Sequence, residues 1–128
     1  MKVHSGLGPG FLESVYQNAL SLELAKASLR FKTQHPIPVI YDGVIVGHFV
    51  ADLWINECVI VELKAVNSLV PAHEAQLVNY LSATGVEIGL LLNFGATSLQ
   101  FKRKHRTFRP REASQQQNRI LKNPVNPV

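Results

Sequence analysis

Cysteine is almost absent from this sequence, because the 128 residues contain only Cys58. No internal disulfide can form, which favours a reducing compartment, and we expect the cytoplasm. Long apolar stretches are missing too. The longest run, around residues 89–92, is far shorter than the roughly 20 residues of a membrane-spanning helix, and no apolar signal segment stands at the N-terminus. The five histidines lack the spacing of a zinc site. These absences favour a soluble protein without zinc and without a membrane partner.

Acidic residues are scarce in the C-terminal part of the chain. From Lys102 onward there are eight Lys or Arg and one acid, Glu112, whereas residues 1–101 hold five basic and eight acidic residues. Prolines, a glutamine run and few large apolar residues follow the strand expected near residue 101. We therefore expect one domain over residues 1–103 and a basic, flexible tail over 104–128. An acidic domain with a basic tail suits an anionic polymer as partner.

Hydrophobic periodicity and turn signals predict a mixed α/β domain. The expected elements are, in order, a helix over 11–27, strands over 33–41, 44–55 and 58–65, a helix over 71–84, and strands over 87–92 and 97–101. Pro36 and Pro38 lack backbone donors, so the first strand should lie at a sheet edge. Asp42-Gly43 predicts a tight hairpin, and Gly85 predicts a helix end. This order predicts a mixed sheet flanked by helices.

Three charged residues stand inside strands that are otherwise apolar. Glu62 and Lys64 interrupt the run from Cys58 to Ala65, and Asp52 lies among apolar residues of the preceding strand. An unpaired charge buried in such a strand costs roughly several kcal/mol, so these residues need a reason to be there. Two carboxylates beside a lysine predict a divalent-metal site with a cation next to it.

The connection between these two strands decides whether the carboxylates meet. Asp52 and Glu62 share a sheet face only if the numbers of paired residues add up to an even value. A two-residue turn at Asn56-Glu57 would pair Ile55 with Cys58 and put the two acids on opposite faces. The metal-site interpretation therefore requires a connection of odd length, such as residues 56–58, or a bulge.

Several motifs resemble the PD-(D/E)XK nuclease superfamily. Asp52, followed by Glu62-x-Lys64, with Glu13 on a preceding helix, is similar to the pattern of that superfamily, although Ala51 replaces the proline of its name. Gly10-Phe-Leu-Glu13-Ser-Val-Tyr16 resembles the motif that names the GxxExxY branch, and Leu91-Leu-Asn93-Phe-Gly95 is also similar to that branch. Gln76-x-x-x-Tyr80 resembles an element of the exonuclease branch. The resemblance covers nearly all of residues 3–103 and implies a restriction-endonuclease-like core and a nuclease activity.

Hydrolysis of a phosphodiester needs an activated water and neutralised phosphoryl charge, which Mg²⁺ or Mn²⁺ supplies. Mg²⁺ binds through one or two carboxylates and keeps several waters, so Asp52 and Glu62 suffice as direct ligands. Lys64, two residues from Glu62 on the same strand face, would hold the attacking water. Glu13 would act as a third acid, on metal-bound water or a second metal. We expect a DNA nuclease that is selective for structure or ends, because no base-reading motif is present.

A second set of residues is expected to support the reaction. Gln76 and Tyr80 share a helix face with His73 and would orient Lys64 or touch the nucleic acid backbone. The supporting or nucleic-acid-binding set is Gln76, Tyr80, Tyr16, Lys102, Arg103, Lys104 and Arg106.

Other interpretations remain open from the sequence. Glu62 and Lys64 alone fit a buried ion pair, and Glu13 alone fits a carboxylate that caps a helix. A non-catalytic nucleic-acid-binding module on the same fold is the alternative function, and a purely structural or partner protein is a third. A homodimer also stays open, because no sequence feature demonstrates or excludes one.

Overall fold

The computed structural model describes residues 2–107, so residues 108–128 of the expected tail lie outside the described part. Eight elements follow one another along the chain: α1 (Lys2–Leu7), α2 (Glu13–Lys26), β1 (Phe31–Tyr41), β2 (Val44–Ile55), β3 (Val59–Lys64), α3 (Pro71–Thr84), β4 (Ile88–Asn93) and β5 (Gln100–His105). The predicted order of helix, three strands, helix and two strands is confirmed, with α1 added in front of it. No helix in the described range is long and apolar enough to cross a membrane.

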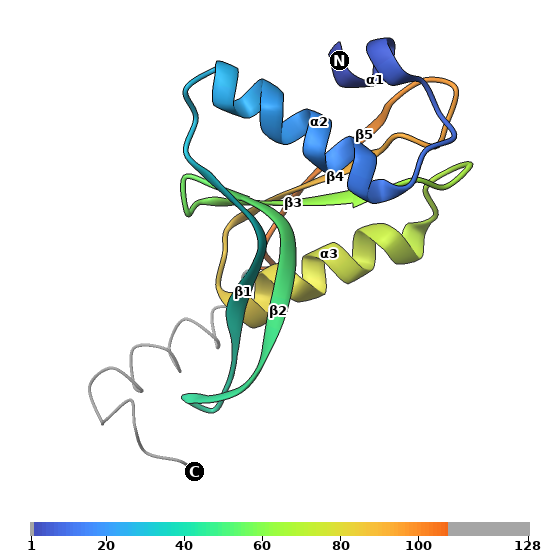
Figure 1. Ribbon diagram of the computed structural model, residues 1–128. Coiled ribbons are helices and arrows are strands. Elements are labelled where there is room, and N and C mark those ends of the chain that lie inside the picture. Colours follow the sequence, from blue (N-terminus) through green and yellow to red (C-terminus); the bar gives the residue numbers. More distant parts are fainter. Residues whose placement is uncertain (1, 108–128) are drawn as a thin grey trace.

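The five strands form one mixed sheet in the order β1-β2-β3-β4-β5. β3 and β4 are parallel and are connected through α3, whereas the other neighbouring pairs are antiparallel. β1 lies at an edge, as its two prolines predict. The β1–β2 hairpin extends well beyond the rest of the sheet (Figure 1). Asp42 and Gly43 at its tip have φ angles of 52° and 77°, the left-handed values that a tight hairpin turn needs.

Helices cover both faces of the central strands, with α2 on one side and α3 on the other (Figure 1). On the α2 side, Tyr16 and Leu20 pack with Val61 and Leu63 of β3. On the α3 side, Leu77 and Leu81 pack with Ile60 of β3 and Leu91 of β4. Alternate residues of β3 therefore enter two separate cores, which is why the strand is a nearly continuous apolar run.

The largest differences from the sequence-based prediction lie at the two ends of the described range. α1 was not expected, because the first predicted element is the helix over 11–27, but the burial of Val3 and His4 holds this short helix against the domain. β5 spans Gln100–His105 instead of 97–101, and it ends two residues beyond the expected domain boundary. Its lysines and arginines are tolerated because an edge strand needs only backbone pairing on one side.

Candidate active site

A pocket of about 170 Å³ opens between α2, α3 and the middle of the sheet. It collects most of the side chains that the sequence singled out. Its lining consists of Glu13, Val50, Asp52, Glu62, Leu63, Lys64, His73, Gln76, Leu77, Tyr80 and Leu91. Four elements thus contribute polar side chains to the pocket. α2 contributes Glu13, and α3 contributes His73, Gln76 and Tyr80. The charged strand residues come from β2 (Asp52) and from β3 (Glu62 and Lys64).

The connection between β2 and β3 has the odd length that a shared face requires. Ile55 pairs with Val59 and Leu53 with Val61, so residues 56–58 form a three-residue loop. Asn56 and Glu57 adopt left-handed φ angles of 52° and 57° in it. Continuing this register brings residues 52 and 62 opposite each other, and both line the pocket.

Asp52 lies where β2 and β3 begin to separate. The backbone pairing of β2 with β3 ends at Leu53 and Val61. Beyond that pair, the Leu63 amide of β3 bonds to the Asp52 side chain and not to the backbone of β2. Its Oδ2 accepts a hydrogen bond from the Leu63 amide at 2.9 Å, and its Oδ1 accepts one from Gln34 Nε2 at 3.1 Å. The carboxylate is therefore held from both sides. Gln34 was missed by the sequence analysis, because nothing in the pattern of a strand shows which polar side chain bends toward a neighbour.

Glu62 is the site residue whose pKa is raised most by its surroundings. Burial, followed by a hydrogen bond to Asp52 and the repulsion from its charge, raises the pKa of Glu62 to about 9, although the nearby Lys64 ammonium and the Asp52 backbone amide act in the opposite direction. Without a bound cation the Glu62 carboxyl is therefore protonated at neutral pH. Two carboxyl groups forced together in a partly buried pocket form an environment that a divalent cation would stabilise by replacing the proton.

Two carboxylates, and not three, form the close set. Within residues 2–107, no group of three or more His, Cys, Asp or Glu side chains is arranged to hold a metal ion. Glu13 lines the same pocket as Asp52 and Glu62 but does not form such a group with them, and its predicted role as a third acid, on metal-bound water or a second metal, stays a prediction. The remaining pair fits Mg²⁺ or Mn²⁺, because these ions bind through one or two carboxylates and complete their shell with water or substrate oxygens.

Helix α3 presents a polar stripe to the pocket. His73, Gln76 and Tyr80 follow one another at spacings of three and four residues, which places them on one face. The ring of Tyr80 stacks on Phe49 of β2 with centroids 4.0 Å apart. His73 Nδ1 accepts a hydrogen bond from the Val70 amide at 3.1 Å, so a neutral His73 carries its proton on Nε2. His73 is thus a third polar group of the pocket from this helix.

A buried amide network fixes the chain between Lys64 and α3. Asn93 is fully buried, and its side chain accepts hydrogen bonds from the Val66 and Gly95 amides and donates one to the Val66 carbonyl. It also donates to Gln100 Oε1, which in turn accepts from the Leu69 amide. These bonds hold the loop that leads from the pocket lysine to the helix that carries the polar stripe.

Tyr16 lies in the core and not in the pocket. Its side chain is fully buried, stacks on Phe94 with centroids 4.6 Å apart and donates a hydrogen bond to the Gly8 carbonyl at 2.6 Å. It also accepts one from the Phe11 amide. A direct contact with nucleic acid is incompatible with this placement. Tyr16 instead clamps the loop before α2, and so it acts on the segment that precedes Glu13.

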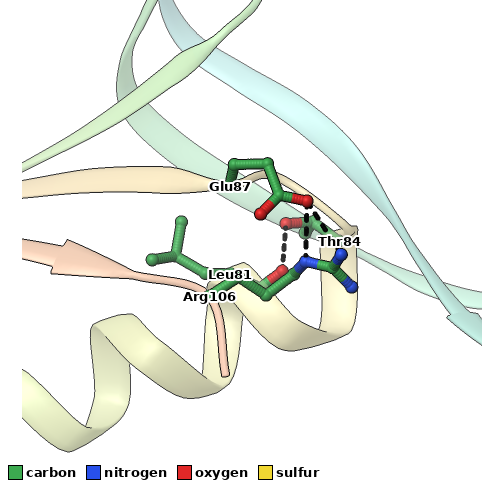
Figure 2. Close-up of polar contacts among 4 residues, drawn as sticks. All are labelled: Leu81, Thr84, Glu87 and Arg106. Carbon is green, nitrogen blue, oxygen red and sulfur yellow. Dashed lines mark hydrogen bonds and ion pairs between the residues drawn. The ribbon is translucent and has the colours of Figure 1, made fainter. Parts of the chain in front are cut away.

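The basic residues of β5, and Arg106 directly after it, differ in what they face. Lys104 pairs with Glu74 of α3 at 2.6 Å. Arg106 Nη2 lies 2.8 Å from Glu87 Oε1. Figure 2 shows this pair beside the last turn of α3, where the Thr84 hydroxyl donates a hydrogen bond to the Leu81 carbonyl. These two cations already have acidic partners within the domain, so phosphate binding would have to compete with them.

Lys102 and Arg103 are exposed. Lys102 pairs across the sheet with Leu91, which lines the pocket, whereas Arg103 pairs with Leu90, which packs against the core on the α2 side. Directly opposed residues point to the same face, so Lys102 is on the pocket side and Arg103 is on the other.

Comparison with known proteins identifies the class. A sequence profile of the PD-(D/E)XK nuclease superfamily matches residues 1–104. The chain therefore belongs to the PD-(D/E)XK nuclease superfamily. The narrower resemblance to the GxxExxY branch continues to depend on the motifs alone. No curated protein matches the sequence.

Solved structures share the fold at low sequence identity. The crystal structure of SSO0001 is 18% identical, with a TM-score of 0.58 over 88% of this chain and 59% of that one. The alkaline exonuclease LHK-Exo from Laribacter hongkongensis is 12% identical, with a TM-score of 0.54 over 84% of this chain and 62% of that one. A structure of LHK-Exo in complex with dAMP is 11% identical, with a TM-score of 0.55 over 84% of this chain and 60% of that one. The chain thus spans about three fifths of the length of these neighbours.

Proposed function

We propose that the protein is a divalent-metal-dependent nuclease that hydrolyses phosphodiester bonds of DNA and selects its substrate by structure or by ends. The observation that carries the proposal is the single pocket containing Asp52, Glu62 and Lys64 together with Gln76 and Tyr80. Membership of a nuclease superfamily and the fold shared with an alkaline exonuclease support it. The dAMP complex of that exonuclease is the reason for preferring DNA.

The two strand carboxylates would hold the metal ion. Asp52 is fixed by two hydrogen bonds, and Glu62 lies beside it with a proton to exchange for the cation. When bound, Mg²⁺ or Mn²⁺ supplies Lewis acidity and lowers the pKa of a coordinated water.

Lys64 would hold the attacking water and oppose charge on the phosphate. Its side chain lies two residues along β3 from Glu62, on the same face, and its charge lowers the pKa of that neighbour. An ammonium placed there stabilises the negative charge that develops on the phosphoryl oxygens. Glu13, at the start of α2, would hold a water at the pocket mouth. Gln76, Tyr80 and the Nε2–H of His73 would orient Lys64 or donate hydrogen bonds to the nucleic acid backbone.

Two further aspects belong to the proposal. The action would take place in the cytoplasm, because a chain with one cysteine forms no internal disulfide. A homodimer is compatible with a sheet that has two edge strands, β1 and β5.

The test is a panel of single-stranded, duplex and branched DNA, incubated with purified protein in Mg²⁺, Mn²⁺ or chelator. The same panel is run with Asp52→Asn, which keeps the shape of the side chain and removes its charge. We expect cleavage of one DNA shape that needs metal and is lost in the variant. Binding without cleavage under every condition would instead favour the non-catalytic nucleic-acid-binding module.

A further inference from the structure

Gln34 has an unusual backbone conformation for a strand residue. It lies inside β1 with a φ angle of 46°, in the left-handed region that side-chain-bearing residues rarely adopt. In the described range, the other non-glycine residues with positive φ, which are Ser28, Asp42, Asn56 and Glu57, all lie in turns or loops between elements. Local backbone strain of this kind concentrates at functional sites, where it places a side chain that a relaxed strand would send elsewhere.

The Gln34 side-chain amide contacts the Asp52 carboxylate. Gln34 Nε2 donates to Asp52 Oδ1 at 3.1 Å, while the Leu63 amide donates to Asp52 Oδ2 at 2.9 Å. These two donors, one on each oxygen, fix the rotation of the carboxylate about its own axis. The carboxylate also shares a hydrogen bond with the Glu62 side chain, and a cation in the pocket would take the place of that proton.

The same amide connects the sheet to α2. Gln34 Nε2 also donates to Gln17 Oε1 at 2.6 Å. Gln17 follows Glu13 by four residues, so the two side chains occupy one face of α2. Gln34 therefore bridges Asp52 and the helix that carries the third acid of the pocket. Because Gln34 is exposed, water can replace its hydrogen bonds, and their contribution to folding is small.

We propose that Gln34 is a positioning residue of the metal site: its side-chain amide fixes the Asp52 carboxylate and joins it to α2. The inference rests on the proposed function, because it assumes that Asp52 binds the metal. Groups that orient a metal ligand in this way typically change metal affinity by about 10- to 100-fold when they are removed.

The first experiment measures Mn²⁺ affinity by electron paramagnetic resonance in wild type, Gln34→Ala, Gln34→Gly and Ser28→Gly. Both Gln34 variants lack the amide, but only the glycine relieves the backbone strain. Ser28, with a φ angle of 59° in a loop, controls for strain relief elsewhere. We expect both Gln34 variants to bind Mn²⁺ about tenfold more weakly or worse, and Ser28→Gly to bind like wild type.

The second experiment needs no metal. Amide hydrogen exchange of Leu63 is followed in chelator, because this amide donates to the carboxylate that Gln34 holds. We expect faster exchange of Leu63 in both Gln34 variants than global stability accounts for, and no such change in Ser28→Gly. Unchanged Leu63 protection in both variants overturns the positioning role, whatever the Mn²⁺ result. Failure of wild type to bind Mn²⁺, with Leu63 deprotected in the variants, overturns the metal site and with it the role of Gln34 in metal binding, and shows that Gln34 orients Asp52 for the fold alone.

Discussion

At the scale of single residues, the site is defined by a conflict between two neighbouring acids. Asp52 receives hydrogen bonds at both oxygens, whereas Glu62 is half-buried beside it, and its pKa is raised to about 9. A purely structural role would be served better by apolar side chains, because a buried charged group rarely adds stability. The arrangement is explained if a cation completes it.

This conflict predicts a pH dependence of folding in metal-free protein. The pKa of Glu62 is about 4.5 in the unfolded chain and about 9 in the folded protein. Between these values the unfolded chain has lost a proton that the folded protein keeps, so the free energy of unfolding falls as pH rises. Glu62→Gln removes the titration. In urea unfolding with chelator, we expect wild type to lose on the order of 1 to 2 kcal/mol more than the variant between pH 5.5 and 7.5. Parallel pH profiles of the two proteins would contradict the shift.

The sequence predicted the residues whose chemistry conflicts with their surroundings. Glu62 and Lys64 interrupt an apolar strand, and this alone singles them out. Gln34 escaped because glutamine in an exposed edge strand is ordinary, and only the observed φ angle distinguishes it. Tyr16 was predicted within the supporting or nucleic-acid-binding set, and the structure shows that its hydroxyl and ring make contacts within the domain. Burial of an aromatic residue depends on tertiary packing, which a motif does not reveal.

At the scale of elements, short connections position the site. The three-residue loop over 56–58 sets which face of the sheet Asp52 occupies. The Asn93 network sets the path from Lys64 to α3. Gly95 takes part in this second connection, because an added Cβ would lie 2.4 Å from the Val66 carbonyl oxygen and 2.5 Å from the Val66 nitrogen.

Gly95→Ala should therefore destabilise the fold. Backbone atoms cannot move aside as the end of a flexible side chain can, so we expect a loss of at least about 2 kcal/mol in the free energy of unfolding. Gly47→Ala is the matched control, because no heavy atom lies within 4 Å of its added Cβ. Thermal and urea unfolding of both variants measure the difference. Equal stabilities would show that the Val66 loop is free to shift and is not clamped.

Element prediction succeeded where local signals were strong. α3 begins at Pro71 and is capped by Gly85, as predicted, and Asp42-Gly43 forms the hairpin turn. β5 was placed too early, because its register comes from pairing with β4 and not from apolar alternation in its own sequence. α1 has only six residues, too few for a periodic pattern, and its burial against the domain became visible only in the structure.

At the scale of the whole molecule, charge is distributed unevenly around the pocket. Lys104 and Arg106 are paired with Glu74 and Glu87, whereas Lys102 is exposed on the pocket side of β5. Phosphate contacts are the source of salt-dependent nucleic acid binding. Among the described cations of β5, we therefore propose Lys102 as the one that contacts a DNA strand entering the pocket.

Lys102→Ala should weaken DNA binding mainly at low salt. We expect the slope of log affinity against log salt to decrease in magnitude by about 1. Arg103→Ala, one residue away on the opposite face, is the control and should change the slope less. Fluorescence anisotropy with labelled DNA at several salt concentrations provides the measurement. An equal effect of the two variants would mean that the basic strand attracts DNA without orienting it over the pocket.

The class of the molecule was predictable because its motifs and its fold agree. The mixed sheet flanked by helices and the spacing of Gln76 and Tyr80 follow from the sequence. The even pairing sum between β2 and β3 was only a requirement of the metal-site interpretation, and the register of the two strands decided it. The close association of only two acids did not follow. Glu13 reaches the pocket from α2, but a sequence contains no measure of the distance between a helix and a strand.

The proposed function requires this pocket to be a nuclease active site that depends on Lys64. The most direct test compares cleavage of one labelled DNA in Mg²⁺ by wild type, Lys64→Ala and Lys26→Ala, the control being a lysine at the end of α2 that pairs with Glu23. We expect wild type and Lys26→Ala to cut at the same rate, and Lys64→Ala to be slower by about 100-fold or more. Cleavage by Lys64→Ala at the wild-type rate would contradict the proposed role of Lys64 and of this pocket in DNA cleavage.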